Sequence, residues 1–165
     1  MSDEALCVWV TGPGRASMET IARELARRLA ARGQAVELFD AGTPGIASVD
    51  AAGIGFVAGA LARHGVTSVV ALPADRAARE RARHEVGRLI EVHVDEAGTP
   101  GPPGYEPPEH AEVEVVVPEE TPGAGVERAL CTLEVLGLLA PEAGQGYSEA
   151  EERDVIRRLK AFGYL

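Results

Sequence analysis

The chain is nearly devoid of lysine: Lys160 is the only one among 165 residues. Its formal net charge is -10 and its pI is near 4.9. Proteins bind nucleic acids through clustered lysine and arginine that neutralise phosphates, so this charge argues against a nucleic-acid partner. The sequence also lacks an apolar run as long as a membrane span and an N-terminal secretion-signal pattern. We therefore expect a cytoplasmic protein with no membrane partner.

Cysteine is scarce as well, with only Cys7 and Cys131. Cys7 falls in an apolar run and Cys131 in a late helical pattern, so we expect two buried core thiols rather than a disulfide or a metal pair. The four histidines show neither helix-face pairing nor neighbouring cysteines. No metal site is expected.

What the chain does have is an alternation of strand and helix patterns. Short, nearly continuous apolar runs suit strands that are covered on both faces. Helical patterns lie between them, one with a face of Ile21, Leu25 and Leu29. This alternation predicts an α/β fold, a three-layer parallel sheet with helices on both sides. The predicted strands are residues 6–10, 35–39, 68–72, 89–94 and 113–117.

Three further helices are expected before the C-terminal region. One has an apolar face of Ile54, Val57 and Leu61, one is the arginine-rich segment 76–88, and one runs from the Thr121 cap to about residue 138. The Gly/Pro-rich connection 97–108 cannot form a helix. The expected organisation is an α/β domain at 1–139, a linker at 140–147 and an amphipathic helix at 148–165.

The C-terminal helix is predicted from a capping box, Ser148-x-x-Glu151, followed by a stripe of apolar residues. Two arrangements of this helix are open at this stage. It packs on its own domain, or it docks on a second subunit or another protein.

A glycine turn joins the first predicted strand to the first helix, which is the frame of a phosphate-binding loop. In the motif G-x-x-x-x-G-K-[ST], backbone N–H groups and the lysine hold phosphates, and the hydroxyl binds Mg²⁺. Counted from Gly12, the last three positions are Ser17, Met18 and Glu19. We expect Glu19 in the first helical turn, where its carboxylate opposes a triphosphate. The remnants of a nucleotide site are Gly12, Gly14, Arg15 (the sole cation of the turn), Ser17 and Thr20.

A set of short segments follows in a definite order along about residues 5–138. The segments are Trp9-Val-Thr-Gly12, Ile21-Ala-x-x-Leu25, Gly33, Val36-Glu-x-x-Asp40, Ile54-Gly-Phe-Val-Ala58, Leu61-Ala-Arg63, Gly65-Val66, Glu91-Val-x-Val-Asp95 and Tyr105-Glu-Pro-Pro108. Together they resemble the adenylylsulfate kinase family. That family has a P-loop kinase fold, and the resemblance implies transfer of the γ-phosphate of ATP to the 3′-hydroxyl of adenylylsulfate with Mg²⁺, commonly by a dimer, in sulfate assimilation.

The chain departs from the family pattern both where the family binds ATP and where it binds adenylylsulfate. Of the carboxylate pair that the family carries after the second strand, only Asp40 remains. Asp50, Ala52 and Gly53 stand where the family has the Asn and the arginines that hold adenylylsulfate. The turn after the third strand keeps only Arg76, and the basic lid is reduced to residues 97–104. Phosphoryl transfer depends on positioning and charge neutralisation. We therefore expect a degenerate member that lacks the P-loop lysine and has no phosphotransferase activity.

Such a protein would act as a binding, regulatory or structural subunit. No cofactor and no metal are expected, and Asp40 and Arg76 are catalytic remnants only. The expected partner is a second copy or another protein, and the C-terminal helix is the candidate contact surface.

Two alternatives are open. In the first, the chain is an active kinase that uses ATP and Mg²⁺, with Arg15 in place of the lysine and Asp40 as the base. In the second, Glu19, Asp40 and Asp75 at the carboxyl ends of the strands form an acidic mouth for an uncharged or cationic ligand.

Overall fold

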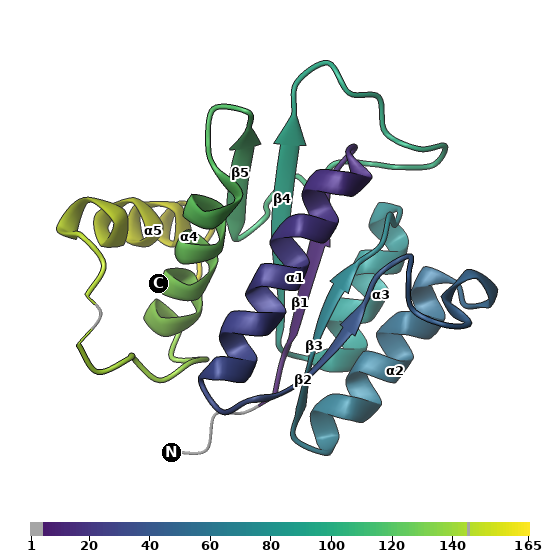
Figure 1. Cartoon of the computed structure of the whole chain (residues 1–165), viewed down its shortest axis with the longest axis horizontal. Coiled ribbons are helices and arrows are strands. Elements are labelled where there is room, and N and C mark those ends of the chain that lie inside the picture. Colours follow the sequence, from purple (N-terminus) through teal and green to yellow (C-terminus); the bar gives the residue numbers. More distant parts are fainter. Residues whose placement is uncertain (1–4, 145) are drawn as a thin grey trace.

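The structure is a computed structural model that describes residues 5–144 and 146–165. Five parallel strands form one sheet in the order β2-β3-β1-β4-β5 (Figure 1). All five predicted strands are confirmed: two have the predicted ends, and the ends of the other three differ by at most two residues. The strands are β1 (Cys7–Thr11), β2 (Ala35–Phe39), β3 (Val66–Ala71), β4 (Leu89–Glu96) and β5 (Val113–Val117).

Helices cover both faces of this sheet, which confirms the three-layer α/β fold (Figure 1). α1 (Arg15–Ala31) and α4 (Pro122–Val135) pack on one face, over a core that includes Val8 and Val92. α2 (Ala51–Arg63) and α3 (Arg76–Val86) pack on the other face, over Trp9 and Val70. A short 3₁₀ turn, Ile46–Ser48, precedes α2. None of the described helices has the length and apolar character needed to cross a membrane.

The predicted apolar face of α2 is partly wrong. Ile54 is buried, but Val57 is 37% exposed and Leu61 is only half-buried. The buried face carries Gly55 and other small residues because α2 lies close to α3. A Cβ atom on Gly55 would lie 2.8 Å from the Cβ of Ala82. Small residues, rather than large apolar ones, mark this helix contact.

The C-terminal helix α5 (Glu149–Ala161) packs on its own chain. It begins with the predicted capping box of Ser148 and Glu151. Its buried Val155 and Leu159 contact Cys131 of α4. α5 thus lies outside α4, as Figure 1 shows.

The predicted boundaries at 139 and 147 stay a prediction. Residues 1–4 of the expected domain and residue 145 of the expected linker lie outside the described residues. α4 ends at Val135, three residues before the expected end near 138. The chain reverses there through Gly137, which has a φ of 69° that favours glycine.

Candidate functional site

The turn between β1 and α1 consists of Gly12, Pro13 and Gly14, because α1 already begins at Arg15. In a phosphate-binding loop the helix follows the motif, whereas here positions 15–19 are helical. The Met18 N–H is consequently engaged within the helix and donates to the Gly14 carbonyl at 3.2 Å. This early start leaves a short turn where a phosphate cradle would need a longer loop.

Glu19 does not lie in the first turn of α1, contrary to the expectation from sequence, because no acidic residue is found there. The early helix start moves Glu19 into the second turn. Its carboxylate accepts from Arg15 Nε at 2.9 Å and from an Arg23 nitrogen at 3.2 Å. Glu19 is therefore an internal ion-pair partner.

Both turn glycines have packing reasons for lacking a side chain. A Cβ atom on Gly12 would lie 2.5 Å from the Val94 carbonyl oxygen, and one on Gly14 would collide with the carboxylate of Glu96. Close approach to β4 explains their presence in the turn without a bound phosphate.

Glu96, at the end of β4, lies over the N-terminal end of α1. Its Oε2 atom is 3.4 Å from the Ser17 hydroxyl oxygen. Gly14, the N-cap of α1, provides no side-chain hydrogen bond to the helix. A carboxylate at a helix N-terminus is stabilised by the helix dipole, and anions bind at the same place. The Glu96 carboxylate therefore lies where a bound anion such as phosphate would interact with the N-terminus of α1.

The residue at the lysine position is part of the core. Met18 is only 2% exposed and belongs to the cluster beneath α1. Thr20, at the last remnant position, is exposed and its hydroxyl donates to the Ala16 carbonyl within the helix. The Met18 side chain is thus enclosed in the core, and the Thr20 hydroxyl hydrogen is engaged with its own helix.

The two catalytic remnants lie in different places. Asp40 is 7% exposed, accepts from Arg23 at 3.1 Å and accepts from the Gly42 N–H. Arg76, the first residue of α3, pairs with Glu80 at 2.8 Å and with Glu109. Their contacts have no partner in common, and none of the cavities described below is lined by both.

Asp50 and Asp75 cap helices. Asp50 accepts from the Gly53 N–H at the start of α2, and Asp75 accepts from the Ala78 N–H at the start of α3, each at 2.7 Å. Both line a cavity of about 390 Å³, here named the α2–α3 cavity. Asp75 does not join Glu19 and Asp40 in one acidic mouth: Glu19 lines a different cavity.

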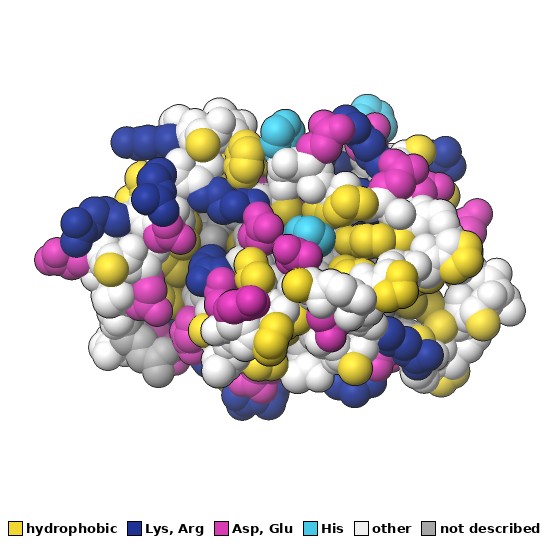
Figure 2. All heavy atoms as spheres, turned by 90° about the horizontal axis from the view of Figure 1, so that it is seen from above, with side chains coloured by type: hydrophobic (Ala, Val, Ile, Leu, Met, Phe, Trp, Pro, Cys, Tyr) yellow, Lys and Arg dark blue, Asp and Glu magenta, His cyan; other side chains and the backbone are white. Residues whose placement is uncertain are grey.

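That second cavity, here named the loop cavity, has a volume of about 260 Å³ and adjoins the turn after β1. Figure 2 looks onto this end of the molecule and shows apolar side chains gathered beside interspersed charges of both signs. The residues that line the loop cavity are Gly12, Pro13, Arg15, Met18, Glu19, Ala41, Ala71, Pro73, Pro100, Gly101 and Pro102.

The segment 97–108 contains no helix, as predicted, and contributes to both cavities. Its half-buried Tyr105 lies 3.1 Å from His93 of β4, measured from the hydroxyl oxygen to Nε2. Burial lowers the pKa of His93 and raises that of Tyr105. This contact fastens the segment to the sheet.

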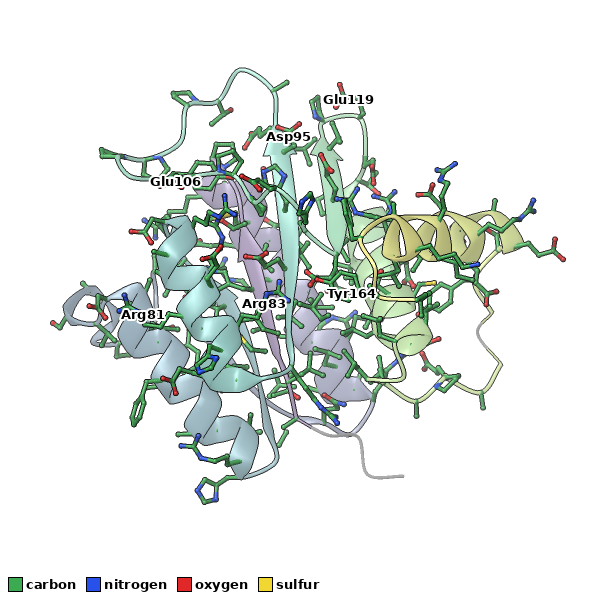
Figure 3. All side chains as sticks on the ribbon, turned by 180° about the vertical axis from the view of Figure 1, so that it is seen from behind. Arg81, Arg83, Asp95, Glu106, Glu119 and Tyr164 are labelled. Carbon is green, nitrogen blue, oxygen red and sulfur yellow. The ribbon has the colours of Figure 1, made fainter. Side chains whose placement is uncertain are left out.

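Between α3 and β4, sequence reasoning missed a largely buried ionic network. Arg79 pairs with Glu91 at 3.0 Å, and Arg83 pairs with Glu91 at 3.2 Å and with Glu112 at 2.8 Å. The Tyr164 hydroxyl donates to Glu112. In Figure 3, Arg83 projects from α3 and Tyr164 approaches from the C-terminal side. Burial, followed by the hydrogen bond to Glu112, raises the pKa of Tyr164 to about 12.

The cysteine prediction is confirmed, because Cys7 and Cys131 are both buried and free. Burial raises the pKa of Cys7 to about 12 and that of Cys131 to about 11. Within residues 5–144 and 146–165, no group of histidine, cysteine and acidic side chains has the arrangement of a metal site.

No protein-family model matches the sequence. The solved hexameric APS kinase from Thiobacillus denitrificans is 26% identical with a TM-score of 0.66, and the match covers 85% of this chain and 31% of that chain. A solved APS kinase from Mycobacterium tuberculosis has a TM-score of 0.63 at 19% identity, covering 79% of this chain and 98% of that one. The latter likeness concerns the fold alone.

Two proteins are also similar to this chain in sequence. An adenylyl-sulfate kinase from Synechococcus is 38% identical over 108 residues, which is 58% of this chain and 62% of that relative, so the match spans less than two thirds of its length. A probable adenylyl-sulfate kinase from Pyrococcus abyssi is 30% identical over 174 residues, covering 82% of this chain and 99% of the relative. The chain belongs to the adenylyl-sulfate kinase family.

Proposed function

We propose that this protein is a family member without phosphotransferase activity that acts as a binding or regulatory subunit. The observation that carries the proposal is the position of Glu96 over the N-terminus of α1, in contact with Ser17. A negative charge there repels the β- and γ-phosphates of ATP, which would need that same helix end.

The part of the site that would bind ATP also lacks groups that neutralise the charge of its phosphates. The lysine position is the buried Met18, and Arg15 is paired with Glu19. Pro13 has no backbone N–H, so the turn offers one donor fewer. Catalysis of phosphoryl transfer rests on such donors, cations and metal ions. Their replacement supports a protein that retains the fold without the reaction.

The proposed partner is a second copy of the chain or another cytoplasmic protein. The relative from Thiobacillus denitrificans is described as hexameric, which makes self-association the first possibility to test. The C-terminal helix is a less favourable contact than expected, since Val155 and Leu159 are buried against α4. Sedimentation velocity over a range of protein concentrations tests this part of the proposal.

The decisive experiment is isothermal titration with ATP–Mg²⁺ and ADP–Mg²⁺, together with a coupled assay using adenylylsulfate. Concentrations should detect dissociation constants up to about 1 mM, which is roughly 4 kcal/mol of binding. An active adenylyl-sulfate kinase serves as the positive control. We expect neither heat nor turnover. Turnover of ATP above background contradicts the proposal.

The alternative, an active kinase, has one observation in its favour: Arg15 lies on the rim of the loop cavity, and its side chain is 69% exposed. If Arg15 replaces the lysine and Asp40 is the base, then Arg15→Ala and Asp40→Asn abolish turnover. Equal rates in wild type and both variants remove this alternative.

A further inference from the structure

The loop cavity has unusually stiff and apolar walls. Four of its lining residues are Pro13, Pro73, Pro100 and Pro102, and Met18 contributes an apolar side chain. Proline fixes its own φ and has no backbone N–H. These walls therefore offer few hydrogen-bond donors to a phosphate and present rigid C–H surfaces to whatever enters.

The charges that line the cavity cancel each other. Arg15 and Glu19 are its charged lining residues, and they pair with each other at 2.9 Å. Glu96, which lies against Gly14 beside the cavity, adds one negative charge. An anionic ligand would have to compete with Glu19 for Arg15, and a cationic ligand would have to compete with Arg15 for Glu19. The surroundings favour an uncharged ligand.

We propose that the loop cavity binds a small, uncharged aromatic molecule, held between proline walls. This inference rests on the proposed function, since it requires that the site no longer takes nucleotide phosphates. The volume of about 260 Å³ lies just below the usual range for drug-sized ligands, so it suits one or two rings. Proline surfaces pack well on aromatic rings, as they do in the recognition of proline-rich peptides.

The protein contains its own reporter for this cavity. Trp9 is the single tryptophan, is fully buried, and donates from Nε1 to the Leu72 carbonyl at 3.1 Å. The next residue, Pro73, lines the cavity. A ligand that presses on Pro73 alters the surroundings of Trp9, so indole fluorescence measures occupancy.

Three probes of similar shape test the charge requirement: benzamide is neutral, benzoate is an anion and benzylamine is a cation. Each is titrated into the full chain and followed by Trp9 fluorescence and by calorimetry. We expect saturable binding of benzamide with a dissociation constant of about 1 mM or tighter. Benzoate and benzylamine are expected to bind at least about tenfold more weakly, a factor that corresponds to loss of one favourable contact.

A variant that obstructs the cavity tests the location of the site, and the same substitution outside the cavity is its matched control. Ala41 and Ala47 are both exposed, but only Ala41 lines the cavity, so Ala41→Phe places a ring at the cavity and Ala47→Phe adds the same ring outside the lining. We expect the first variant to lose benzamide binding and the second to keep it, with both folded by circular dichroism. Absence of saturable benzamide binding, equal binding of all three probes, or unchanged binding in Ala41→Phe overturns the inference.

These outcomes are separate from those of the nucleotide experiment. ATP turnover contradicts the proposed function whatever benzamide does. A chain that binds neither ATP nor benzamide retains the proposed function and overturns only the aromatic site.

Discussion

The carboxylate of Glu96 lies 3.4 Å from the hydroxyl oxygen of Ser17, so the end of β4 meets the first turn of α1. The two residues are far apart in sequence, and each is unremarkable on its own. Together they place a fixed negative charge at the helix end where the fold would otherwise receive an anion.

Glu96→Gln tests this relationship directly. The neutral side chain loses its interaction with the helix dipole, so the free energy of unfolding should fall by about 0.3–1 kcal/mol. The variant should also be stabilised by added pyrophosphate more than the wild type is. Urea unfolding with and without pyrophosphate measures both effects. Glu106→Gln, at an exposed position in segment 97–108, is the control that should change neither (Figure 3).

Met18→Lys restores the motif lysine, yet we expect it to destabilise the protein. Met18 is only 2% exposed and packs in the core, so an ammonium group there is buried without a partner. The cost should be about 3 kcal/mol or more. Met18→Leu keeps volume and polarity and should cost less than about 1.5 kcal/mol. Equal stability of the two variants by urea unfolding would show that the position opens to solvent.

His93 should give the protein a dependence of stability on pH. Burial lowers its pKa, so the unfolded chain binds the proton more tightly than the folded one. Its contribution is complete above the unfolded pKa of about 6.5 and is lost as the pH falls through the lower folded value.

Melting temperatures between about pH 8 and pH 5.5, the range around the unfolded histidine pKa, measure this effect. The advantage of wild type over His93→Gln should shrink as the pH falls. Ser48→Ala changes an exposed position that carries no titratable group, so this variant should keep a constant difference from wild type. A constant difference for His93→Gln as well would show that protonation of His93 is not linked to folding.

Tyr164 should contribute to stability through Glu112. Glu112 is 1% exposed and accepts from the Tyr164 hydroxyl and from Arg83. Tyr164→Phe removes one hydrogen bond to a buried carboxylate, and the free energy of unfolding should fall by about 1.5–3 kcal/mol. Deletion of Leu165, which is 55% exposed, leaves that hydroxyl in place and should have little effect. Comparable losses in the two variants would assign the effect to the chain end in general.

The buried thiols provide a simpler test. Because burial raises the pKa of Cys7 to about 12, its reactive thiolate is scarce at neutral pH. Cys131 is buried as well and its pKa is raised to about 11. We expect no reaction with a thiol reagent at pH 8 in the folded protein, and reaction of both cysteines in denaturant. Rapid reaction of one thiol in the native state would reveal local opening at that position.

Local patterns predicted most of the fold. The five strands were found because continuous apolar runs are typical of strands buried on both faces. Thr121 and Ser148 cap α4 and α5 as expected, since capping depends on residues a few positions apart. The face of α2 was less accessible to pattern analysis, because Gly55 is buried through its closeness to Ala82 of another helix.

The candidate site was harder to predict for the same reason. The sequence shows which residues stand at the motif positions, but it does not show where the helix begins. α1 starts at Arg15 without a side-chain cap, so no capping residue marks that start in the sequence. The contact of Glu96 with Ser17 spans 79 positions, and that of Tyr164 with Glu112 spans 52. The only available signal was topological: β4 lies beside β1, so its last residue meets the turn after β1.

Pro73 and Pro102 line both the loop cavity and the α2–α3 cavity. A displacement of either proline therefore changes the shape of both cavities at once. If a molecule in one cavity displaces these prolines, we expect it to change the affinity of the other cavity for its own ligand, and thermodynamic reciprocity requires the same effect in the other direction. Pro73 and Pro102 are thus the residues through which occupancy of the loop cavity and of the α2–α3 cavity would be coupled.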